Sequence, residues 1–222
     1  MTSLADAPDR LRAARLYLIL ETRVGDRRAA EIVEPALRGG VDVVQLRDKS
    51  ASDHEIVATG RDLRDLCREH GALLVVNDRP DLALRCGADG VHMGQHDEQA
   101  RAVRERVGHR LLIGTSTHSP EQVIAAERSV ADYLGVGPVY ETPTKPGRAA
   151  VGLELVRHAA EHASKPWFAI GGIDAGNAPA VVAAGASRIA VVRAIRDARD
   201  PEDAARALRD AIETEAAVGQ AH

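Results

Sequence analysis

Short apolar runs rich in β-branched residues alternate with amphipathic stretches along the whole chain. Most of these runs are apolar at every position, which is typical of parallel strands that are covered on both faces. Glycine, aspartate, serine or proline marks the joins. We therefore expect eight strands, at residues 16–20, 41–46, 73–76, 90–93, 111–114, 133–136, 167–170 and 189–192.

The stretches between the predicted strands place apolar residues at helical spacing, most clearly at 53–69 and 201–217. Ser119, Pro120 and Gln122 predict a helix start, with serine as the N-cap and proline at the first helical position. Eight strand–helix repeats predict an α/β fold, the single-domain (β/α)8 TIM barrel. An open doubly wound sheet is the alternative, because alternation of strands and helices does not establish closure.

Length and composition limit the class of protein. A chain of 222 residues fits one domain spanning 1–222, whose ends, roughly 1–12 and 214–222, we expect to be loosely ordered. The net charge of -4, with both signs scattered, leaves no basic face for nucleic acid. No apolar run approaches membrane-spanning length, and the N-terminus lacks the order of a signal peptide. Because Cys67 and Cys86 fit neither a disulfide framework nor a zinc site, we expect a cytoplasmic protein.

Polar residues cluster after the ends of the predicted strands rather than before their starts. In a (β/α)8 barrel these segments share the C-terminal rim, where the active sites of this architecture lie. One rim would therefore collect the candidate residues, which lie at 45–49, 77–78, 92–97, 115–118, 142–145, 171–172 and 193.

Gln45, Arg47 and Lys49 alternate along an extended segment, so their side chains can project to the same side. Arg47 offers a planar fork of donors and Lys49 a compact charge, a pair that suits a diphosphate. The alternative is that both are solvated loop residues. Because both residues follow a wholly apolar strand, an anion clamp explains them as well as a solvated loop does.

Asp78 and Asp97 follow neighbouring predicted strands, so their carboxylates are expected at the same rim. Oxygen ligands of this kind suit Mg²⁺, which often bridges carboxylates to a substrate's phosphates. Each aspartate alone is better explained as a helix N-cap. Taken together, with Asn77 and His92 beside them, they favour a metal site in which His92 has a supporting role.

Ser116 and His118 follow the fifth strand and are free of the helix start at Ser119. No carboxylate that could orient the histidine is identifiable, so a nucleophile–base pair is weakly supported. We expect the hydroxyl and the imidazole to form hydrogen bonds with a substrate.

The segment 135–147 is rich in glycine and proline and is too long for a simple connector. Long loops on this rim are often lids or binding loops. Thr142, Thr144 and Lys145 would supply two hydroxyls and an ammonium to phosphate oxygens, and closure of the loop would exclude water. An unstructured surface excursion is the alternative.

Gly171 and Gly172 end the seventh strand, and glycine lets backbone amides approach an anion closely. Val192 and Arg193 follow the eighth strand and would face them. Phosphate sites built from the loops after strands seven and eight recur in this barrel class. We therefore expect a phosphate monoester here, which also favours a closed barrel.

Together these motifs resemble the thiamin phosphate synthase family over nearly the whole chain. The resemblance implies condensation of a hydroxymethylpyrimidine diphosphate with a hydroxyethylthiazole phosphate, a transferase reaction that releases diphosphate. The segments that carry the resemblance are 45–49, 77–79, 81–83, 88–97, 114–118, 131–140, 142–145 and 169–173.

The resemblance also implies roles for single residues. It implies that Mg²⁺ binds the leaving diphosphate, and the residues that match its ligands in this chain are Asp78 and Asp97. The carry-over assigns the pyrimidine diphosphate to Gln45, Arg47, Lys49, Asn77, Ser116 and Lys145. It assigns the thiazole phosphate to Thr142, Thr144, Gly172, Val192 and Arg193. A dissociative displacement is expected, because an aminopyrimidine can delocalise a methylene cation and the thiazole nitrogen needs no general base.

Arg193 departs from the family pattern, in which a small serine is common, although an added cation is compatible with a phosphate. A thiazole tautomerase-like isomerase on the same fold is the nearest alternative, yet it has no obvious use for a diphosphate apparatus made of Arg47, Lys49, Asp78, Asp97 and Lys145. A non-catalytic phosphate-ligand protein is another alternative and would bind without turnover. The sequence does not give the oligomeric state.

Overall fold

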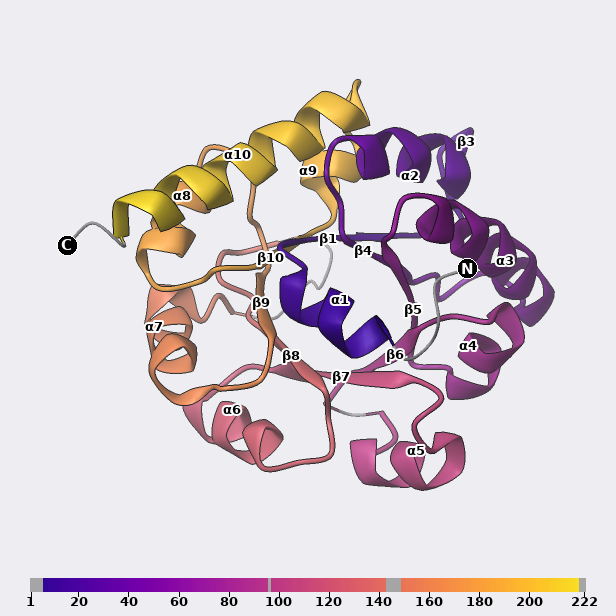
Figure 1. Cartoon of the computed structure of the whole chain (residues 1–222), viewed down its shortest axis with the longest axis horizontal. Coiled ribbons are helices and arrows are strands. Elements are labelled where there is room, and N and C mark those ends of the chain that lie inside the picture. The colour runs from indigo at the N-terminus through magenta and orange to yellow at the C-terminus, as the bar shows by residue number, and fades with distance from the viewer. Residues whose placement is uncertain (1–5, 96, 143–148, 220–222) are drawn as a thin grey trace.

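Eight parallel strands close into a barrel in the computed structural model, which describes residues 6–95, 97–142 and 149–219 (Figure 1). Each strand pairs with its neighbours in chain order, and β1 pairs with both β4 and β10. Closure confirms the barrel and excludes the open sheet. The barrel strands are β1 Leu16–Leu20, β4 Val43–Leu46, β5 Leu73–Asn77, β6 Gly90–Met93, β7 Leu112–Thr117, β8 Tyr133–Val136, β9 Trp167–Ile170 and β10 Ile189–Val191.

Strand β7 is longer than predicted. The sequence pattern ends this strand at residue 114, but the strand continues to Thr117. The added residues are polar, yet Ser116 pairs with Gly135 and Thr117 with Val136 of β8. The Thr117 hydroxyl donates to the carbonyl of Gly135 at 3.1 Å. Backbone pairing and this hydrogen bond therefore extend the strand into the rim.

Helices cover the outside of the barrel and follow the strands along the chain (Figure 1). Helix α3 has the predicted bounds, and Ser52 and Glu55 form a reciprocal capping box at its start. Ser119 caps α6 through the amide of Gln122, as predicted. The outer helices are α2 Ala29–Arg38, α3 Asp53–Glu69, α4 Pro80–Cys86, α5 Ala100–Val107, α6 Pro120–Glu127, α7 Gly152–His162, α8 Ala178–Ala183, α9 Arg193–Arg196 and α10 Pro201–Gly219.

The N-terminal segment differs from the expectation of a loosely ordered end up to residue 12. Residues Ala7–Ala13 form helix α1, which lies across one end of the barrel (Figure 1). Its Ala7 and Leu11 are buried in the barrel interior against strand residues such as Leu73. Burial of these apolar side chains holds the segment in place. A short antiparallel hairpin, β2 Arg23–Val24 with β3 Arg27–Arg28, was also not predicted.

The core has two layers, as alternation of strand side chains requires. The larger layer lies between barrel and helices and includes Leu18, Val44 and Val76. The smaller layer fills the barrel interior and includes Tyr133 and Phe168. The interior layer is therefore the floor of any cavity that opens at the carboxyl ends of the strands.

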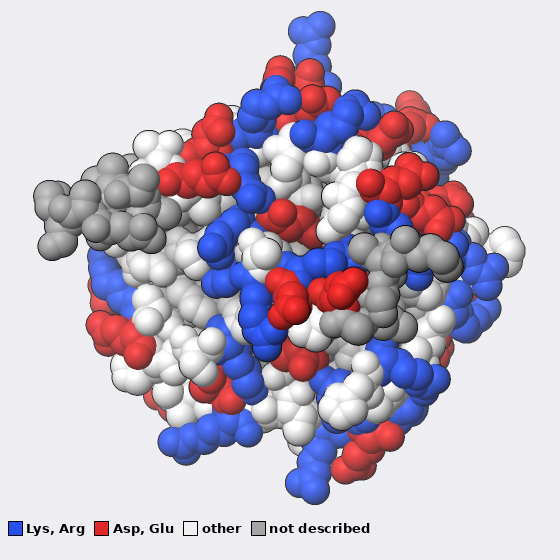
Figure 2. Space-filling model, viewed as in Figure 1, with Lys and Arg blue, Asp and Glu red and all other residues white. Residues whose placement is uncertain are grey.

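Basic and acidic side chains are mixed over the face shown in Figure 2, and no broad basic region is visible there. This arrangement agrees with the scattered charges of the sequence. Within the described residues, no helix combines the length and the apolar character needed to cross a membrane.

Candidate active site

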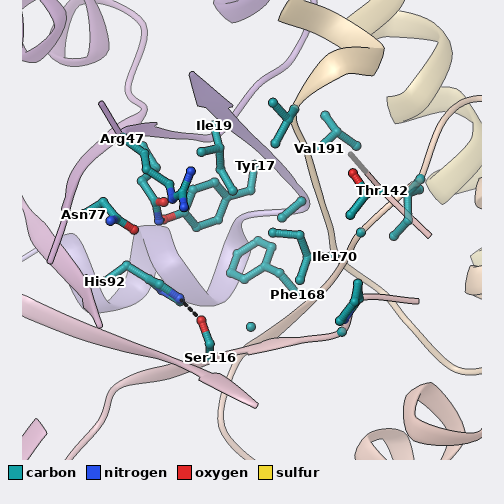
Figure 3. A pocket seen from close by; sticks show the side chains of 18 of the residues that line it. Tyr17, Ile19, Arg47, Asn77, His92, Ser116, Thr142, Phe168, Ile170 and Val191 are labelled. Carbon is teal, nitrogen blue, oxygen red and sulfur yellow. Dashed lines mark hydrogen bonds between the residues drawn. The ribbon is translucent and has the colours of Figure 1, made fainter. Parts of the chain in front are cut away.

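A cavity of about 940 Å³ opens at the carboxyl ends of the barrel strands. In Figure 3, Arg47 and Asn77 lie on one side of it and Thr142 lies on the other. Thr144 and Lys145 lie outside the described residues. All other predicted site residues line this one cavity: Gln45, Arg47, Lys49, Asn77, Asp78, Asp97, Ser116, Thr142, Gly172, Val192 and Arg193.

Strand β4 and the residues after it supply the predicted anion clamp. Gln45 is the part of the clamp that lies within the strand, and it is only 3 % exposed. Arg47 and Lys49 follow the strand and line the cavity, as their alternation predicted. Among the described residues, neither side chain is held by a hydrogen bond or ion pair within its own protein. Both cations are therefore available to an anion in the cavity.

Asp48, between the two cations, holds the clamp segment in place and was not singled out in the sequence. One carboxylate oxygen accepts hydrogen bonds from the Thr22 hydroxyl and amide. The other accepts from the Ser50 hydroxyl and from the amides of Ser50 and Ala51. Burial opposes ionisation of this carboxyl, but the hydrogen bonds outweigh it and lower the pKa of Asp48. The clamp is thus tied to the loop after β1.

Asp78 and Asp97 meet at the rim, as their placement on neighbouring strands predicted. Their side chains are in hydrogen-bonding contact. Burial and the neighbouring Asp97 carboxyl raise the pKa of Asp78 to about 6, while Lys49 and Arg47 act in the opposite direction. Two carboxyls held together in this way repel each other when both are ionised. A bound cation would remove that repulsion.

Neither aspartate caps a helix, so the alternative explanation is wrong for both. Helix α4 has Arg79 at its N-cap and α5 has Gln99, and neither cap uses a side-chain hydrogen bond. Asp97 instead accepts the amide of Gly94 at 2.7 Å. A Cβ on Gly94 would collide with that carboxylate, so the glycine leaves room for it.

The backbone of Asp78 is in an uncommon conformation. Its φ of 59° is the one positive value at a non-glycine position in the described part of the chain. Aspartate tolerates this left-handed region better than most residues. The Asp78 amide donates to the carbonyl of His92 at 2.9 Å, which fixes the turn. Such conformations are often found at functional sites.

The donor set fits a hard divalent cation. Carboxylate oxygens are the ligands that Mg²⁺ prefers, and one or two carboxylates with waters and substrate phosphates are typical of its sites. The described residues place no group of three acidic, histidine or cysteine side chains in a metal-binding arrangement. The Asp78–Asp97 pair would therefore need oxygen atoms from a substrate or from water to complete a coordination shell.

A chain of hydrogen bonds crosses the cavity floor and includes two tyrosines that the sequence analysis missed. Gln45 Nε2 donates to the Tyr17 hydroxyl at 2.8 Å, and the Tyr17 and Tyr133 hydroxyls are 3.0 Å apart. His92 Nδ1 is 3.2 Å from the Tyr133 hydroxyl, and His92 Nε2 is 3.0 Å from Ser116 Oγ (Figure 3). His92 thus contacts Ser116, and the supporting role expected for it at a metal site stays a prediction. The signal in the sequence was one tyrosine within β1 and another at the start of β8, each in an otherwise apolar strand.

His118 lines the same cavity, at the end of β7. Its Nδ1 is in hydrogen-bonding contact with the carbonyl of Gly137, and its amide donates to Gln122 Oε1 at 2.7 Å. The imidazole is thus tied to the segment after β8. Its predicted hydrogen bond with a substrate stays a prediction.

The segment after β8 packs onto the end of β9 in its described part. Val139 and Tyr140 donate their amides to the carbonyls of Ile170 and Gly171, at 2.8 and 2.9 Å. This part is therefore not a free surface excursion. Gly172 has a φ of 66°, and a Cβ there would collide with Tyr140. Close packing of the two rim segments explains this glycine, in addition to the access to an anion that was expected.

Arg193 begins the short helix α9, is exposed and lines the cavity. The pKa of Asp197, which also lines the cavity, is lowered mainly by its hydrogen bond with Arg196 and to a lesser degree by the charge of Arg193. No hydrogen bond joins the Arg193 guanidinium to another side chain in the described ranges. A third cation is thus available on this rim.

An apolar floor separates the polar groups of the two sides. Ile19, Phe168 and Ile170 line the middle of the cavity (Figure 3). The Phe168 ring stands edge-on to the rings of Tyr17 and Tyr133, with centroids 5.1 and 6.0 Å away. The cavity thus combines polar margins with a partly aromatic floor, which suits a flat ligand with charged substituents.

The closed barrel with a cavity at the carboxyl ends of its strands places the chain among the (β/α)8 barrel proteins. Residues 16–195 match the family model described as thiamine monophosphate synthase. The chain therefore belongs to the thiamine monophosphate synthase family, as the motifs of the sequence indicated.

Relatives and solved structures agree with this assignment. The chain is 56 % identical over 196 residues to a protein of Gloeobacter violaceus named thiamine-phosphate synthase, and 53 % identical over 204 residues to one of Thermus thermophilus with the same name. These matches cover 88 and 89 % of the chain. They cover 57 % of the first relative and 97 % of the second, so the chain spans little more than half the length of some curated relatives.

Among solved structures, thiamine phosphate pyrophosphorylase from Pyrococcus furiosus superimposes with a TM-score of 0.84 at 37 % identity. The superposition covers 94 % of this chain and 98 % of that one. The similarity therefore extends over the whole barrel.

Proposed function

We propose that this protein is a thiamine-phosphate synthase that joins hydroxymethylpyrimidine diphosphate to hydroxyethylthiazole phosphate and releases diphosphate. Its relatives of Gloeobacter violaceus and Thermus thermophilus are named for this activity. The observation that carries the proposal is the meeting of Arg47, Lys49 and the Asp78–Asp97 pair at one side of the cavity. Two cations beside two carboxylates that could hold a divalent cation suit a diphosphate.

The first substrate would place its diphosphate on this side. Arg47 and Lys49 would neutralise the charge that grows on the diphosphate as its bond to the methylene carbon breaks. Ser116 and Asn77 would add hydrogen bonds. Mg²⁺ held by Asp78 and Asp97 would supply further charge neutralisation for the leaving group when bound. The assignment of Lys145 to the same diphosphate site stays a prediction.

The second substrate would place its phosphate on the opposite side of the cavity. Thr142, Gly172, Val192 and Arg193 line that side and would bind the phosphate through a hydroxyl, backbone groups and a guanidinium. Thr144 is predicted to bind the same phosphate. Separate anion sites at the two margins would hold the reacting rings between them, over the apolar floor.

The reaction would need positioning and charge stabilisation rather than a base. The thiazole nitrogen has a free electron pair that forms the new bond to the methylene carbon, while the electrons of the broken bond leave with diphosphate. An aminopyrimidine stabilises the intervening cation, so the displacement can be dissociative. Holding both rings in one cavity supplies proximity. The absence of an acid–base pair from the predicted site residues agrees with this chemistry.

The test is an assay of diphosphate release by the purified protein in Mg²⁺, with and without the thiazole phosphate. We expect thiamin phosphate and diphosphate to form in equal amounts only when both substrates are present. Diphosphate release that needs no thiazole phosphate would indicate hydrolysis instead and would contradict the proposal.

The same assay separates the two alternatives. A tautomerase-like isomerase would change the thiazole phosphate without consuming the pyrimidine diphosphate. A non-catalytic carrier would bind ligand in Mg²⁺ without turnover. We expect neither result, because the diphosphate side of the cavity carries Arg47, Lys49, Asp78 and Asp97 together.

A further inference from the structure

The hydrogen-bond chain on the cavity floor can be polarised in two opposite directions, and its first link decides between them. Gln45 Nε2 lies 2.8 Å from the Tyr17 hydroxyl, and an amide nitrogen can only donate. Tyr17 therefore accepts one hydrogen from Gln45 and still has one hydrogen to give. Within the described residues, the acceptor in reach of that hydrogen is the Tyr133 hydroxyl, 3.0 Å away.

The opposite polarity leaves a buried group unsatisfied. If Tyr133 donated to Tyr17, the Tyr17 oxygen would accept two hydrogens and its own hydrogen would lack an acceptor. Tyr17 is only 2 % exposed, so a hydroxyl hydrogen without an acceptor there is costly. Burial raises the pKa of both tyrosines, so each hydroxyl keeps its single hydrogen. Donation from Tyr17 to Tyr133 is therefore favoured.

The remaining links follow from this direction. Tyr133 has used its oxygen as an acceptor, and its hydrogen points to His92 Nδ1 at 3.2 Å. A neutral imidazole that accepts at Nδ1 carries its hydrogen on Nε2. That hydrogen is donated to Ser116 Oγ at 3.0 Å. The hydroxyl hydrogen of Ser116 is then directed away from His92.

We propose that the chain Gln45–Tyr17–Tyr133–His92 fixes the Nε2–H tautomer of His92 and thereby makes the Ser116 hydroxyl a donor toward the cavity. Tyr17, Tyr133 and His92 are positioning residues that act through Ser116. This orientation is useful because diphosphate oxygens only accept hydrogen bonds, and a serine that donated to His92 would have no hydrogen left for them. This last step rests on the proposed function, whereas the tautomer does not.

The surrounding residues hold the hydrogen-bonded side chains in position. A Cβ on Gly114 would collide with both Tyr133 and His92, so the glycine provides the space in which they meet. Gln95 Nε2 donates to the backbone carbonyl of Ser116, which fixes the serine from the rim side. The edge-on contact of Phe168 with both tyrosine rings restricts their rotation. The hydroxyls are therefore held in line.

The tautomer can be read directly by NMR of protein labelled with ¹⁵N-histidine, without any ligand. The spectrum is recorded at about pH 9, well above the ordinary imidazole pKa of ~6.5, so that the ring is neutral. The signal among the nine histidines is assigned by its loss in His92→Asn. We expect hydrogen on Nε2 in the wild type. Hydrogen on Nδ1 would overturn the proposal.

Two variants test the cause of the tautomer. In Gln45→Glu the new carboxylate accepts from Tyr17 and reverses every link, so we expect His92 to carry its hydrogen on Nδ1. Ser116→Ala is the matched control at the other end of the chain, and we expect it to keep hydrogen on Nε2. An unchanged tautomer in Gln45→Glu, or a switched one in Ser116→Ala, would show that Gln45 does not set the direction.

The link to ligand binding is tested with inorganic pyrophosphate and Mg²⁺ in calorimetry. We expect Ser116→Ala to weaken binding about 10-fold, and Tyr133→Phe to weaken it less. In the double variant, Tyr133→Phe should add nothing, because it acts only through the Ser116 hydroxyl. Additive losses would overturn the positioning role. Failure of the wild type to bind pyrophosphate would count against the proposed function and leave the tautomer result intact.

Discussion

The Thr22 hydroxyl donates a hydrogen bond to the Asp48 carboxylate at 2.7 Å, joining the loop after β1 to the segment that carries the two cations of the anion clamp. Arg47 and Lys49 flank Asp48 in the chain and line the cavity. Because successive side chains of an extended segment point in opposite directions, anchoring Asp48 directs both cations inward. The carboxylate thus positions groups that it does not touch.

We expect Asp48→Ala to raise the KM for the pyrimidine diphosphate about 10-fold, or ~1.4 kcal/mol, because the clamp segment loses its charged hydrogen bonds. Steady-state kinetics would measure the change. Asp48→Asn should lie between wild type and Asp48→Ala, since an amide oxygen still accepts. Asp62→Ala, an exposed aspartate on α3, is the control and should be unaffected. Equal effects in Asp48→Ala and Asp62→Ala would contradict the anchoring role.

Loss of the carboxylate pair should remove activity without unfolding the protein. We expect Asp97→Ala to lower kcat/KM about 100-fold, or ~2.7 kcal/mol, because the leaving diphosphate loses its cation. Excess chelator should abolish wild-type activity, and added Mg²⁺ should restore it. The control is Asp81→Ala, an exposed aspartate in the first turn of α4 near Asp78. Full activity in chelator would refute the metal assignment.

The carboxyl pair also predicts how stability depends on pH in metal-free protein. The pKa of Asp78 is raised from 3.8 to about 6 in the fold, so the folded state holds more protons than the unfolded state between these values. Stability should therefore fall as pH rises through this window and level off above it. The loss should be about 1 kcal/mol, because solvent screens a half-buried site.

Chemical denaturation at pH 4.5 and pH 7.5 would measure this slope. Other groups titrate in the same range, so the informative quantity is the difference from Asp78→Asn, which cannot ionise. We expect the variant to lose less stability than the wild type over this interval. Identical slopes in the two proteins would show that Asp78 titrates normally.

The parts of the site that could be predicted from the sequence are those fixed by strand order. Asp78 and Asp97 follow neighbouring strands, and parallel strands bring their carboxyl ends to one edge whatever the curvature of the sheet. The alternation of Arg47 and Lys49 is likewise local. Both expectations needed only the apolar pattern of the strands, which is dictated by burial on both faces.

The parts that could not be predicted depend on closure and on loop geometry. Tyr17 and Tyr133 lie on β1 and β8, which are not neighbours in the sheet, and they meet across the interior only because the barrel closes. Asp48 and Thr22 meet because two loops converge above the barrel. The N-terminal helix α1 has a short polar sequence, and its Leu11 gains burial only from the open end of the barrel. None of these contacts has a signal in local periodicity.

Arg193 should determine affinity for one substrate and not for the other. It lines the cavity with Val192 and Gly172, on the side proposed for the thiazole phosphate. We expect Arg193→Ser to raise the KM for the thiazole phosphate about 10-fold, since a hydrogen bond to a charged group contributes ~1.5–3 kcal/mol before screening by solvent. The KM for the pyrimidine diphosphate should stay within about twofold of the wild type, a margin well below the ~1.4 kcal/mol of a tenfold change.

Arg199→Ser is the matched control, because Arg199 is exposed in the segment after α9 and does not line the cavity. Kinetics with each substrate varied in turn would separate the two effects. A rise in both KM values would mean that Arg193 serves the leaving diphosphate as well. An unchanged KM for the thiazole phosphate would place that phosphate away from α9, and the division of the cavity into two anion sites would have to rest on Thr142 and Gly172 alone.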